Sequence, residues 1–318
     1  MPFVRRAVID VGTNSVKLLV AEVAGREVRP VCEDSQQTRL GQGFYETLRL
    51  QPEAIANTAH AVARFATDAR QLKTESLRVI ATSATRDAVN PHDLLTAIEN
   101  AAGLKTEIIS GEQEADWAFQ GVTTDPILAA QPLLLIDVGG GSTEFILGQG
   151  EQRYFCQSFR LGTVRLLETI PPDEPPTAAG LAETRRWLQE FIETKIQPVL
   201  QPALQHQTKL EAPRFPVILV GTGGTTSILA RMEAHLESYE RERIEATRLS
   251  LARVHWHNEQ LWRLPLAQRQ EIVGLPRNRA DIILAGAAIY ESVMASFGFS
   301  ELRVSTRGLR FAAVMDSP

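Results

Sequence analysis

The sequence predicts an α/β protein built from two related halves. Short apolar segments with the length of buried strands alternate with longer segments that have the apolar spacing of helices. Residues 9–15 and 136–142 share the pattern Ile-Asp-Val-Gly-x-x-Ser, and each segment is flanked by strand-forming residues. A repeat that covers strand, turn and strand indicates an internal duplication. A chain of 318 residues is longer than a single hydrophobic core usually supports. We therefore place a first domain at 1–125 and a second at 126–318.

The elements of the first half follow from apolar spacing and turn chemistry. Residues 7–11 form a short, mostly apolar run that includes Asp10. Residues 12–15 are turn formers, and residues 16–23 resume strand-forming side chains, which predicts a hairpin. A helix at 53–72 is indicated by one apolar stripe of Ile55, Ala59, Val62, Phe65 and Ala66. The remaining predicted elements are a strand at 77–81, a helix at 91–102 that opens with proline, a strand at 107–109 and a helix at 111–121.

The second half repeats the hairpin and continues the alternation. A strand at 133–138, a turn at 139–143 and a strand at 144–148 correspond to the first hairpin. The further elements are a loop at 171–180, a helix at 181–200, a strand at 217–220, a turn at 221–225 that opens a helix, a helix at 280–297, a strand-like run from Val304 and a helix at 309–315. The sequence leaves open whether this last helix packs on the first or the second domain.

Composition and charge argue against several classes of protein. The net charge is −5, whereas a broad nucleic-acid-binding surface would need a basic face. No apolar run approaches the roughly 18 residues of a membrane span, and the N-terminal apolar run is broken by Asp10, unlike that of a signal peptide. Cys32 and Cys156 have no metal-binding or redox spacing. We therefore expect a cytoplasmic protein with reduced cysteines that binds neither nucleic acid nor membranes.

Three glycine-rich turns follow apolar strands, at residues 10–15, 137–143 and 221–226. Glycine allows a backbone to approach phosphate oxygens closely, and successive N–H groups form a concavity that binds anions. The third turn also opens a helix, whose N-terminal dipole favours anions. None of the turns has the pattern of a Walker A loop or of a dinucleotide-binding loop. One such turn could be a plain hairpin, but three predict a phosphate site with hydroxyl donors at Thr13, Ser15, Ser142, Thr143, Thr222, Thr225 and Thr226.

Carboxylates lie beside two of these turns. Asp10 and Asp137 end their strands, and Glu144 begins the strand that returns after the second turn. Phosphate would repel these carboxylates unless a cation lay between them, and Mg²⁺ is commonly held by one or two carboxylates together with phosphate oxygens. We therefore predict a site for Mg²⁺ or Mn²⁺ at Asp10, Asp137 and Glu144. The alternative is that the aspartates only hydrogen-bond their own turns.

A helix start near Ser110 offers a candidate base. Ser110 followed by Gln113 is a capping-box pattern, so Ser110 is expected to cap the helix. Glu112 and Glu114 then lie in the first turn, where the helix dipole favours ionised carboxylates. An ionised glutamate near a phosphoryl group can activate water, although acidic residues are also routine at this position.

Two other groups of charged residues have plainer interpretations. His255 and His257 are two residues apart in a helical run, so they point to different faces and are expected to have packing or surface roles rather than to bind a metal. Arg277 and Arg279 flank an expected helix start, where a clamp on the substrate is one conceivable role.

Eight segments of the chain resemble the exopolyphosphatase and guanosine-pentaphosphate phosphatase family. They are AVIDVGTNSVKLLVAEV (7–23), RLGQGF (39–44), ATSATRDAVN (81–90), EIISGEQEADWAFQGV (107–122), LLLIDVGGGSTEFILG (133–148), SFRLGTVRLLE (158–168), VGTGGTTSILA (220–230) and NRADIILAGAAIYES (278–292). The segments occur in the family's order and cover nearly the whole chain. The resemblance implies two ribonuclease-H-like domains of the actin-like ATPase type that flank a cleft.

The resemblance also implies roles for individual residues. Glu114 matches the catalytic base of the family, and Arg86 matches an arginine that faces the substrate phosphates. Asp137 and Glu144 match acidic residues that position metal or water. The three phosphate loops of the family match Asp10, Gly12, Thr13, Asn14 and Ser15, then Gly139, Gly140, Gly141, Ser142 and Thr143, and finally Gly221, Thr222, Gly223, Gly224 and Thr225.

The chain departs from the family near its C-terminus. Where the family usually has Ser-Asp and then Gly-Leu-Arg-Glu-Gly, this sequence has Thr306 and Phe311 at the two acidic positions. A polar role of that segment is therefore not expected in this chain.

The residues and the resemblance together predict a Mg²⁺-dependent phosphohydrolase that releases terminal phosphate from inorganic polyphosphate or from guanosine pentaphosphate (pppGpp). One alternative is a kinase on the same fold, which would move phosphate from a nucleotide to an acceptor. Another is a regulator that binds polyphosphate or nucleotide without turnover. A homodimer is one assembly state that the sequence allows.

Overall fold

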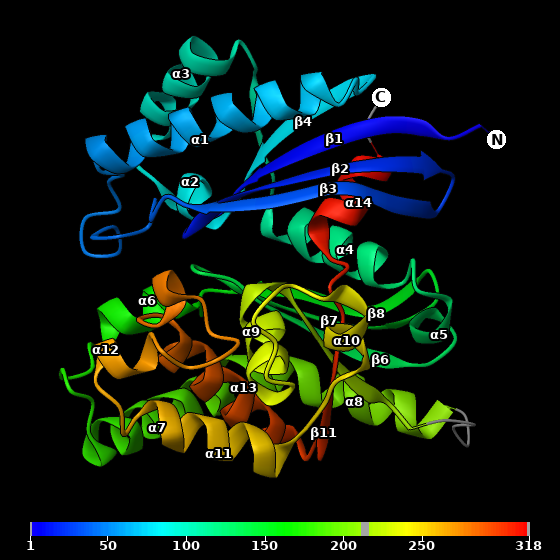
Figure 1. The fold of residues 1–318 in the computed structure, drawn as a ribbon. Coiled ribbons are helices and arrows are strands. Elements are labelled where there is room, and N and C mark those ends of the chain that lie inside the picture. The colour runs from blue at the N-terminus through cyan, green and yellow to red at the C-terminus, as the bar shows by residue number, and fades with distance from the viewer. Residues whose placement is uncertain (1, 211–215, 317–318) are drawn as a thin grey trace. The chain divides into compact units, whose positions relative to one another are not determined.

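The computed structural model describes residues 2–210 and 216–316, and the chain forms two compact units (Figure 1). The first unit comprises Met1–Thr124 and Arg307–Pro318, and the second comprises Asp125–Thr306. Each unit has its own sheet with helices packed on it. The predicted α/β class with two related domains is therefore confirmed.

The sheet of the first unit is centred on its first strand. Its strands are β1 (Val4–Val11), β2 (Ser15–Ala24), β3 (Glu27–Gln37), β4 (Ser76–Ala81) and β5 (Thr106–Ile108), in the order β3-β2-β1-β4-β5. β1 pairs antiparallel with β2 and parallel with β4, and β4 pairs parallel with β5. Because β1 is central and covered on both faces, Ala7, Val8 and Ile9 are all fully buried.

Side chains of β1 pack alternately in the core clusters on the two faces of this sheet. Ile9 packs in the cluster that includes α1 (Pro52–Gln71) and α3 (Pro91–Ala102), and α2 (Ser83–Asp87) lies between β4 and α3. Val8 packs in the cluster that includes Trp117 of α4 (Gly111–Val122) and Phe311 of α14 (Leu309–Met315). Asp10 is two residues from Val8, so its side chain lies on the α4 and α14 face.

The second unit repeats this topology. Its strands are β6 (Leu133–Val138), β7 (Thr143–Gln149), β8 (Gln152–Phe159), β9 (Ile218–Thr222), β10 (Arg248–Ser250) and β11 (Glu301–Val304), in the order β10-β11-β9-β6-β7-β8. β6 pairs antiparallel with β7 and parallel with β9, and β9 pairs parallel with β11. The run β8-β7-β6-β9-β11 therefore corresponds to β3-β2-β1-β4-β5, and the duplication inferred from the hairpins extends over the whole first sheet.

Three strands of the structure were not predicted: the short β10, and the longer strands β3 and β8. β3 and β8 are each the edge strand beside the returning strand of a hairpin. Most of their side chains are exposed or half-buried, so their sequences, EVRPVCEDSQQ and QRYFCQSF, lack the continuous apolar run that marks a buried strand.

Helices α8, α9, α10 and α11 contact strands of the second sheet. The described α-helices of this unit are α5 (Pro126–Ala129), α6 (Thr163–Thr169), α7 (Ala178–Phe191), α8 (Gln197–Leu210), α9 (Gly223–Glu233), α10 (Arg241–Ala246), α11 (Leu251–Leu261), α12 (Leu266–Arg269) and α13 (Ile283–Phe297). None of the described helices combines the length and apolar composition that crossing a bilayer requires.

Several predicted boundaries differ from the structure, and two of these differences have a structural explanation. The helix predicted at 181–200 begins earlier, at Ala178, and contains a π-helical turn at Ile192–Ile196. That turn precedes Pro198, which lacks an N–H and whose ring would clash with the carbonyl four residues before it in an ordinary helix. A strand was expected to begin at Val304, but β11 ends at this residue. Its inward side chains are Leu302 and Val304, and its pairing partner β9 ends at Thr222.

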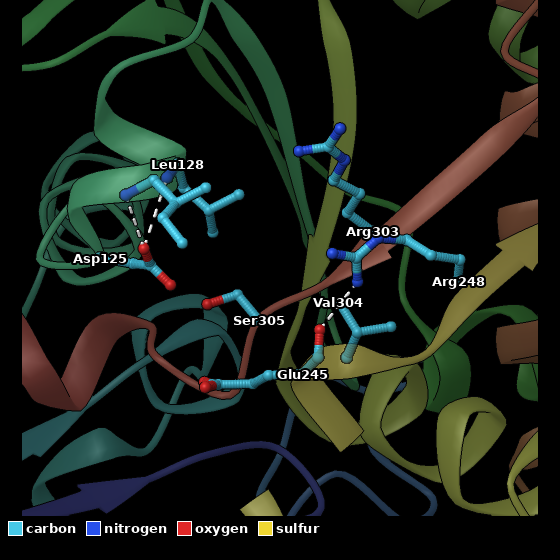
Figure 2. Close-up of a pocket in the computed structure, with 8 residues that line it drawn as sticks. Asp125, Leu128, Glu245, Arg248, Arg303, Val304 and Ser305 are labelled. Atoms are coloured by element: carbon cyan, nitrogen blue, oxygen red, sulfur yellow. Dashed lines mark hydrogen bonds between the residues drawn. The ribbon is translucent and has the colours of Figure 1, made fainter. Parts of the chain in front are cut away.

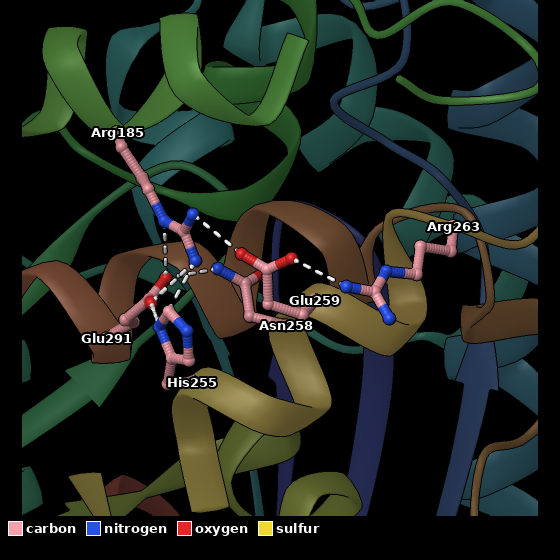
Figure 3. A network of polar contacts seen from close by, with 6 residues as sticks. All are labelled: Arg185, His255, Asn258, Glu259, Arg263 and Glu291. Carbon is pink, nitrogen blue, oxygen red and sulfur yellow. Dashed lines mark hydrogen bonds and ion pairs between the residues drawn. The ribbon is translucent and has the colours of Figure 1, made fainter. Parts of the chain in front are cut away.

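A buried carboxylate, Glu291 of α13, joins three helices of the second unit (Figure 3). Its Oε2 and Oε1 accept hydrogen bonds from Arg185 of α7 at 3.1 and 2.7 Å. On α11, His255 Nδ1 lies 2.5 Å from Glu291 Oε1, and Asn258 donates to Oε2. Arg185 donates a further hydrogen bond to Glu259 at 2.9 Å. The network therefore fastens α7 and α11 to α13.

Replacing Glu291 with glutamine is expected to lower the free energy of unfolding by about 1–3 kcal/mol, because Arg185 loses the more buried of its two carboxylate partners and keeps only Glu259. The expected cost is below that of a fully buried pair, since the side chain of Arg185 is 31% exposed. Urea denaturation measures the change. As a matched control, Glu271→Gln breaks the exposed pair with Arg277 and is expected to change stability by less than about 0.5 kcal/mol. Equal changes in both variants would contradict a structural role for the network.

His255 and His257 contact different neighbours, as expected for packing roles. His255 belongs to the Glu291 network, whereas His257 is buried with its Nε2 2.7 Å from Glu233 of α9. Burial lowers the pKa of His257, and its hydrogen bond to Glu233 only partly offsets this effect.

Candidate active site

The first glycine turn, between β1 and β2, is held from behind by the segment that follows β3. The turn closes with a hydrogen bond from Gly12 N to Ser15 O at 3.0 Å. The carbonyl of Thr13 accepts from Gly41 N at 2.7 Å, and the carbonyl of Asn14 accepts from the N–H groups of Thr38 and Arg39, each at 3.1 Å. Segment 38–41 therefore fixes the orientation of the peptide groups in this turn.

The second glycine turn, between β6 and β7, is held in the same way by the start of α6. Gly139 N donates to Ser142 O at 2.9 Å. The carbonyls of Gly139, Gly140 and Gly141 all accept hydrogen bonds from residues 163–165, with the last one bonded to Arg165 Nε at 2.8 Å. Because the C=O and N–H of a trans peptide point in opposite directions, the N–H groups of residues 140–142 point away from α6.

These three N–H groups are suited to an anion. Within the described part of the chain, none of the N–H groups of Gly140, Gly141 and Ser142 donates a hydrogen bond. Successive N–H groups that point to one side form a concavity with positive potential. The turn predicted from the sequence as a phosphate loop thus has the backbone geometry that such a loop requires.

The third glycine turn lies beside the second, at the start of α9. Thr222 is the N-cap residue, so the first N–H groups of the helix begin at Gly223. Gly223 has a φ of +87°, and a Cβ there would collide with the carboxylate of Asp137. Only glycine can therefore occupy this position while Asp137 stays in place. The structure brings Asp137 of β6 against the helix N-terminus within the second unit.

Several of the predicted hydroxyl donors are engaged inside the protein. Thr143 Oγ1 donates to Leu161 O at 2.5 Å, and Thr226 Oγ1 donates to Thr222 O at 2.8 Å and contacts Tyr290 Oη. These hydroxyls fasten the turns to their surroundings. The side chain of Thr225 lies against Gly286 of α13. What the second and third turns offer to a ligand is therefore chiefly backbone N–H groups.

Asn14, in the first turn, has a different arrangement. Its Oδ1 accepts a hydrogen bond from Gln37 Nε2 at 3.3 Å, whereas its buried Nδ2 has no hydrogen-bond partner among the described residues. A buried amide donor without a partner is costly, so it suits a site where a ligand supplies an acceptor.

Equivalent rows of polar side chains run across the two sheets. In the first unit, Asp10 is directly opposite Lys17 of β2, which is opposite Ser35 of β3. In the second unit, Asp137 is opposite Glu144 of β7, which is opposite Ser158 of β8. Directly opposed residues of antiparallel strands share one face of the sheet. The duplicated rows therefore differ in charge at their middle position: lysine in one and glutamate in the other.

The electrostatics of the two aspartates differ accordingly. Burial raises the pKa of Asp10, while the charges of Lys17 and of Arg310 from α14 oppose this rise. In the second unit, Asp137 has a second carboxylate, Glu144, beside it, and Ser158 Oγ donates to Glu144 Oε1 at 2.7 Å. Two adjacent carboxylates repel each other unless a cation joins them. The second row is therefore the better candidate to hold a divalent metal.

The residues present fit a magnesium ion held largely by its substrate. Mg²⁺ usually takes one or two carboxylates and keeps water and phosphate oxygens as its other ligands. Asp137 and Glu144 of the second unit supply such a pair. In the first unit, considered by itself, Asp10 Oδ1 is a buried oxygen without a hydrogen-bond partner among the described residues. No group of three or more histidine, cysteine, aspartate or glutamate side chains suited to a metal occurs among residues 2–210 and 216–316. The predicted metal role of these three carboxylates thus stays a prediction.

The structure pairs the two residues predicted to be catalytic. Ser110 caps α4 by accepting from Gln113 N at 3.0 Å, as predicted, which places Glu114 in the first helical turn. Arg86 of α2 donates to Glu114 Oε2 at 3.0 Å and to Ile109 O at 3.0 Å. The side chain of Glu114 is 13% exposed. The ion pair therefore fixes the carboxylate while leaving part of it accessible to water.

Sequence reasoning missed Lys17 as a member of the polar row. Lys17 interrupts the apolar strand β2, and a charged side chain in an otherwise buried strand is unusual without a partner. The equivalent residue in the duplicated hairpin is Glu144, which the sequence predicts to be a metal ligand. Comparing the two hairpins position by position would have found it.

Thr306 and Phe311, the two residues that differ from the family pattern near the C-terminus, both contact neighbouring side chains. Thr306 Oγ1 donates to Glu245 Oε1 at 2.5 Å, and Arg241 donates to Thr306. An aspartate at this position would meet the Glu245 carboxylate, so threonine suits its neighbour. Phe311 is 1% exposed and packs with Trp117 in the core of the first unit.

A separate cavity of about 210 Å³ lies in the second unit (Figure 2). It is lined by Asp125, Ile127, Leu128, Glu245, Arg248, Arg303, Val304 and Ser305. Arg248 already donates to the carbonyls of Glu245 and Thr247, at 2.8 and 3.0 Å. None of the residues predicted to bind phosphate or metal lines this cavity.

Comparison with known proteins decides the family. The model of the Ppx/GppA phosphatase family matches residues 19–317. The chain belongs to this family. Exopolyphosphatase 2 of Mycobacterium tuberculosis is 34% identical over 319 residues, which cover 96% of each chain. The resemblance stated from the sequence motifs is thereby confirmed.

Solved structures of other Ppx/GppA proteins share the fold. The crystal structure of the Aquifex aeolicus family member is 28% identical, with a TM-score of 0.76 over 99% of this chain and 97% of that one. An exopolyphosphatase from Cytophaga hutchinsonii is 25% identical, with a TM-score of 0.83 over 97% of this chain and 96% of that one.

Proposed function

We propose that this chain is an exopolyphosphatase: a Mg²⁺-dependent hydrolase that releases orthophosphate from the end of inorganic polyphosphate, with pppGpp as a second substrate. The observation that carries the proposal is the turn at residues 139–142. The carbonyls of residues 139–141 accept hydrogen bonds from residues 163–165, and the N–H groups of residues 140–142 point the other way. The exopolyphosphatase relative from Mycobacterium tuberculosis supports the choice of polyphosphate.

The proposed reaction is a displacement by water at the terminal phosphorus. Glu114 takes a proton from the water as the new O–P bond forms. The P–O bond to the bridging oxygen breaks, the shortened chain leaves with the negative charge on that oxygen, and orthophosphate is released. Arg86, 3.0 Å from the carboxylate, keeps Glu114 in position.

The charge on the phosphate oxygens is stabilised by the backbone and by a cation. The N–H groups of residues 140–142 and the start of α9 donate to these oxygens, and donors that are already oriented cost no reorganisation. Asp137 and Glu144 are the residues that would hold Mg²⁺, which when bound neutralises phosphate charge.

A phosphate-release assay with the purified chain tests the proposal. With Mg²⁺ and polyphosphate, orthophosphate is expected to accumulate as the polymer shortens, and chelation of the metal by EDTA is expected to stop release. The same assay with pppGpp should yield orthophosphate and guanosine tetraphosphate. A kinase would instead need a nucleotide and would produce a phosphorylated acceptor. Tight binding of polyphosphate without any release would favour a regulator and overturn the proposal.

The cytoplasmic location and the homodimer expected from the sequence are part of the same proposal. Cell fractionation and size-exclusion chromatography coupled to light scattering test them.

A further inference from the structure

The tripeptide Arg-Leu-Gly occurs twice, at residues 39–41 and 160–162, and both copies lie at equivalent places in the duplicated fold. The first copy follows β3 and the second follows β8, the equivalent edge strands of the two sheets. Leu40 and Leu161 are 0% and 1% exposed, and each belongs to the core cluster of its own unit. Each leucine therefore anchors its segment in the core directly behind a glycine turn.

The glycine of each tripeptide touches the turn in front of it. A Cβ at Gly162 would lie 2.5 Å from the carbonyl carbon and oxygen of Gly140 and from the N of Gly141. A Cβ at Gly41 would collide with the Cγ2 methyl of Thr13 and lie 3.3 Å from its carbonyl oxygen. Neither glycine has a left-handed φ, so close approach, not backbone conformation, explains why glycine stands at both positions.

Hydrogen bonds join each segment to the carbonyl side of its turn. Gly41 N donates to Thr13 O at 2.7 Å in the first unit. In the second unit, the residue after Gly162, Thr163, donates to Gly139 O at 2.9 Å, and Leu161 O accepts from Thr143 Oγ1 at 2.5 Å. The carbonyls of both turns are thereby drawn toward the backing segment, and the peptide N–H groups are turned the other way.

We propose that the two Arg-Leu-Gly segments are positioning devices that set the direction of the phosphate-binding N–H groups, and that Gly41 and Gly162 are the residues on which this depends. The inference rests on the proposed function, because the N–H groups are taken to bind phosphate. The glycines touch no substrate themselves; they act through the turns against which they pack.

The two positions should differ in sensitivity. At Gly162 the added methyl group meets backbone atoms of the turn, which must move as a whole. At Gly41 it meets the end of a threonine side chain, which can rotate. Displacement of a positioning group by about 1 Å can cost about 10²-fold in rate. Gly162→Ala is therefore expected to lower kcat/KM for polyphosphate by roughly 10²-fold, and Gly41→Ala by less than about 10-fold.

A matched control separates positioning from general loss of stability. Gly103, after α3, has a φ of +67° and no atom within 4 Å of its Cβ position. Gly103→Ala is expected to cost about 1–2 kcal/mol of stability through backbone strain alone. Its kcat/KM at a temperature where the protein stays folded should remain within about twofold of wild type. If Gly162→Ala and Gly103→Ala lose the same stability and the same activity, the positioning role is refuted.

A compensating substitution keeps the inference testable if Gly162→Ala does not fold. Thr13→Ser removes the methyl group that an alanine at position 41 would strike but retains the hydroxyl. The double variant Gly41→Ala/Thr13→Ser should therefore recover to the kcat/KM of Thr13→Ser alone. A double variant that remains as impaired as Gly41→Ala would show that the contact between these two residues is not what sets the turn.

Anion binding without turnover distinguishes this inference from the proposed function. With tripolyphosphate in EDTA, the backbone amide resonances of Gly140 and Gly141 are expected to shift in the wild-type chain and to shift less in Gly162→Ala. If wild type shows these shifts but releases no phosphate, the proposed function fails while the positioning role stands. If folded Gly162→Ala shows the same amide shifts as wild type at the same tripolyphosphate concentration, the positioning role fails.

Discussion

Replacement of Glu114 with glutamine is expected to lower kcat for phosphate release from polyphosphate by roughly 10²–10⁴-fold, with a smaller change in KM. Glutamine has nearly the same size and can still contact Arg86, which lies 3.0 Å from the carboxylate in the native chain. It cannot take a proton from water, so the loss falls on the chemical step. Steady-state kinetics across a range of polyphosphate concentrations measure both parameters.

Glu112 provides the matched control for this variant. It lies in the same first turn of α4 as Glu114 but is exposed. Glu112→Gln removes the same charge from the same helix end, so it should leave kcat within about twofold of wild type. Wild-type kcat in Glu114→Gln, or equal losses in the two variants, would show that Glu114 is not the base.

Replacement of Asp137 with asparagine is expected to raise the Mg²⁺ concentration for half-maximal rate by roughly 10–100-fold and to lower kcat at saturating Mg²⁺. The physical reason is the loss of one of two adjacent carboxylates, Asp137 and Glu144, that face the same side of the sheet. Titration of the initial rate with MgCl₂ gives both quantities.

Asp10→Asn is the informative comparison, because Asp10 occupies the equivalent position in the duplicated hairpin. Lys17 and Arg310 already counter the charge of Asp10, so this variant is expected to shift the Mg²⁺ requirement less than Asp137→Asn does. An unchanged Mg²⁺ requirement in Asp137→Asn, or a larger shift in Asp10→Asn, would place the metal elsewhere.

The central strands and the duplication could be predicted from the sequence because buried elements have a recognisable apolar pattern. Strand β6 matches its predicted range, and helices α3 and α14 do as well. Strands that are covered on both faces read as apolar runs, and helices carry an apolar stripe. The edge strands β3 and β8 lack such an apolar pattern, because one edge and much of their surface face solvent.

The candidate site was predictable in its parts but not in its connections. The glycine turns and the cap at Ser110 depend on local chemistry, which the sequence contains. The pairing of Arg86 with Glu114 depends on how the short helix α2 packs beside α4, and no spacing in the sequence encodes that contact. The Arg-Leu-Gly repeat was visible in the sequence, but its meaning depends on the edge strands that precede it.

The most direct test of the account is the fate of water oxygen during hydrolysis of polyphosphate in ¹⁸O-enriched water. Attack of water on the terminal phosphorus, with Glu114 as the base, should place one ¹⁸O atom in each released orthophosphate and none in the shortened chain, as mass spectrometry would show. Label found in the remaining polymer instead, or an absence of released orthophosphate with Mg²⁺ present, would contradict the account.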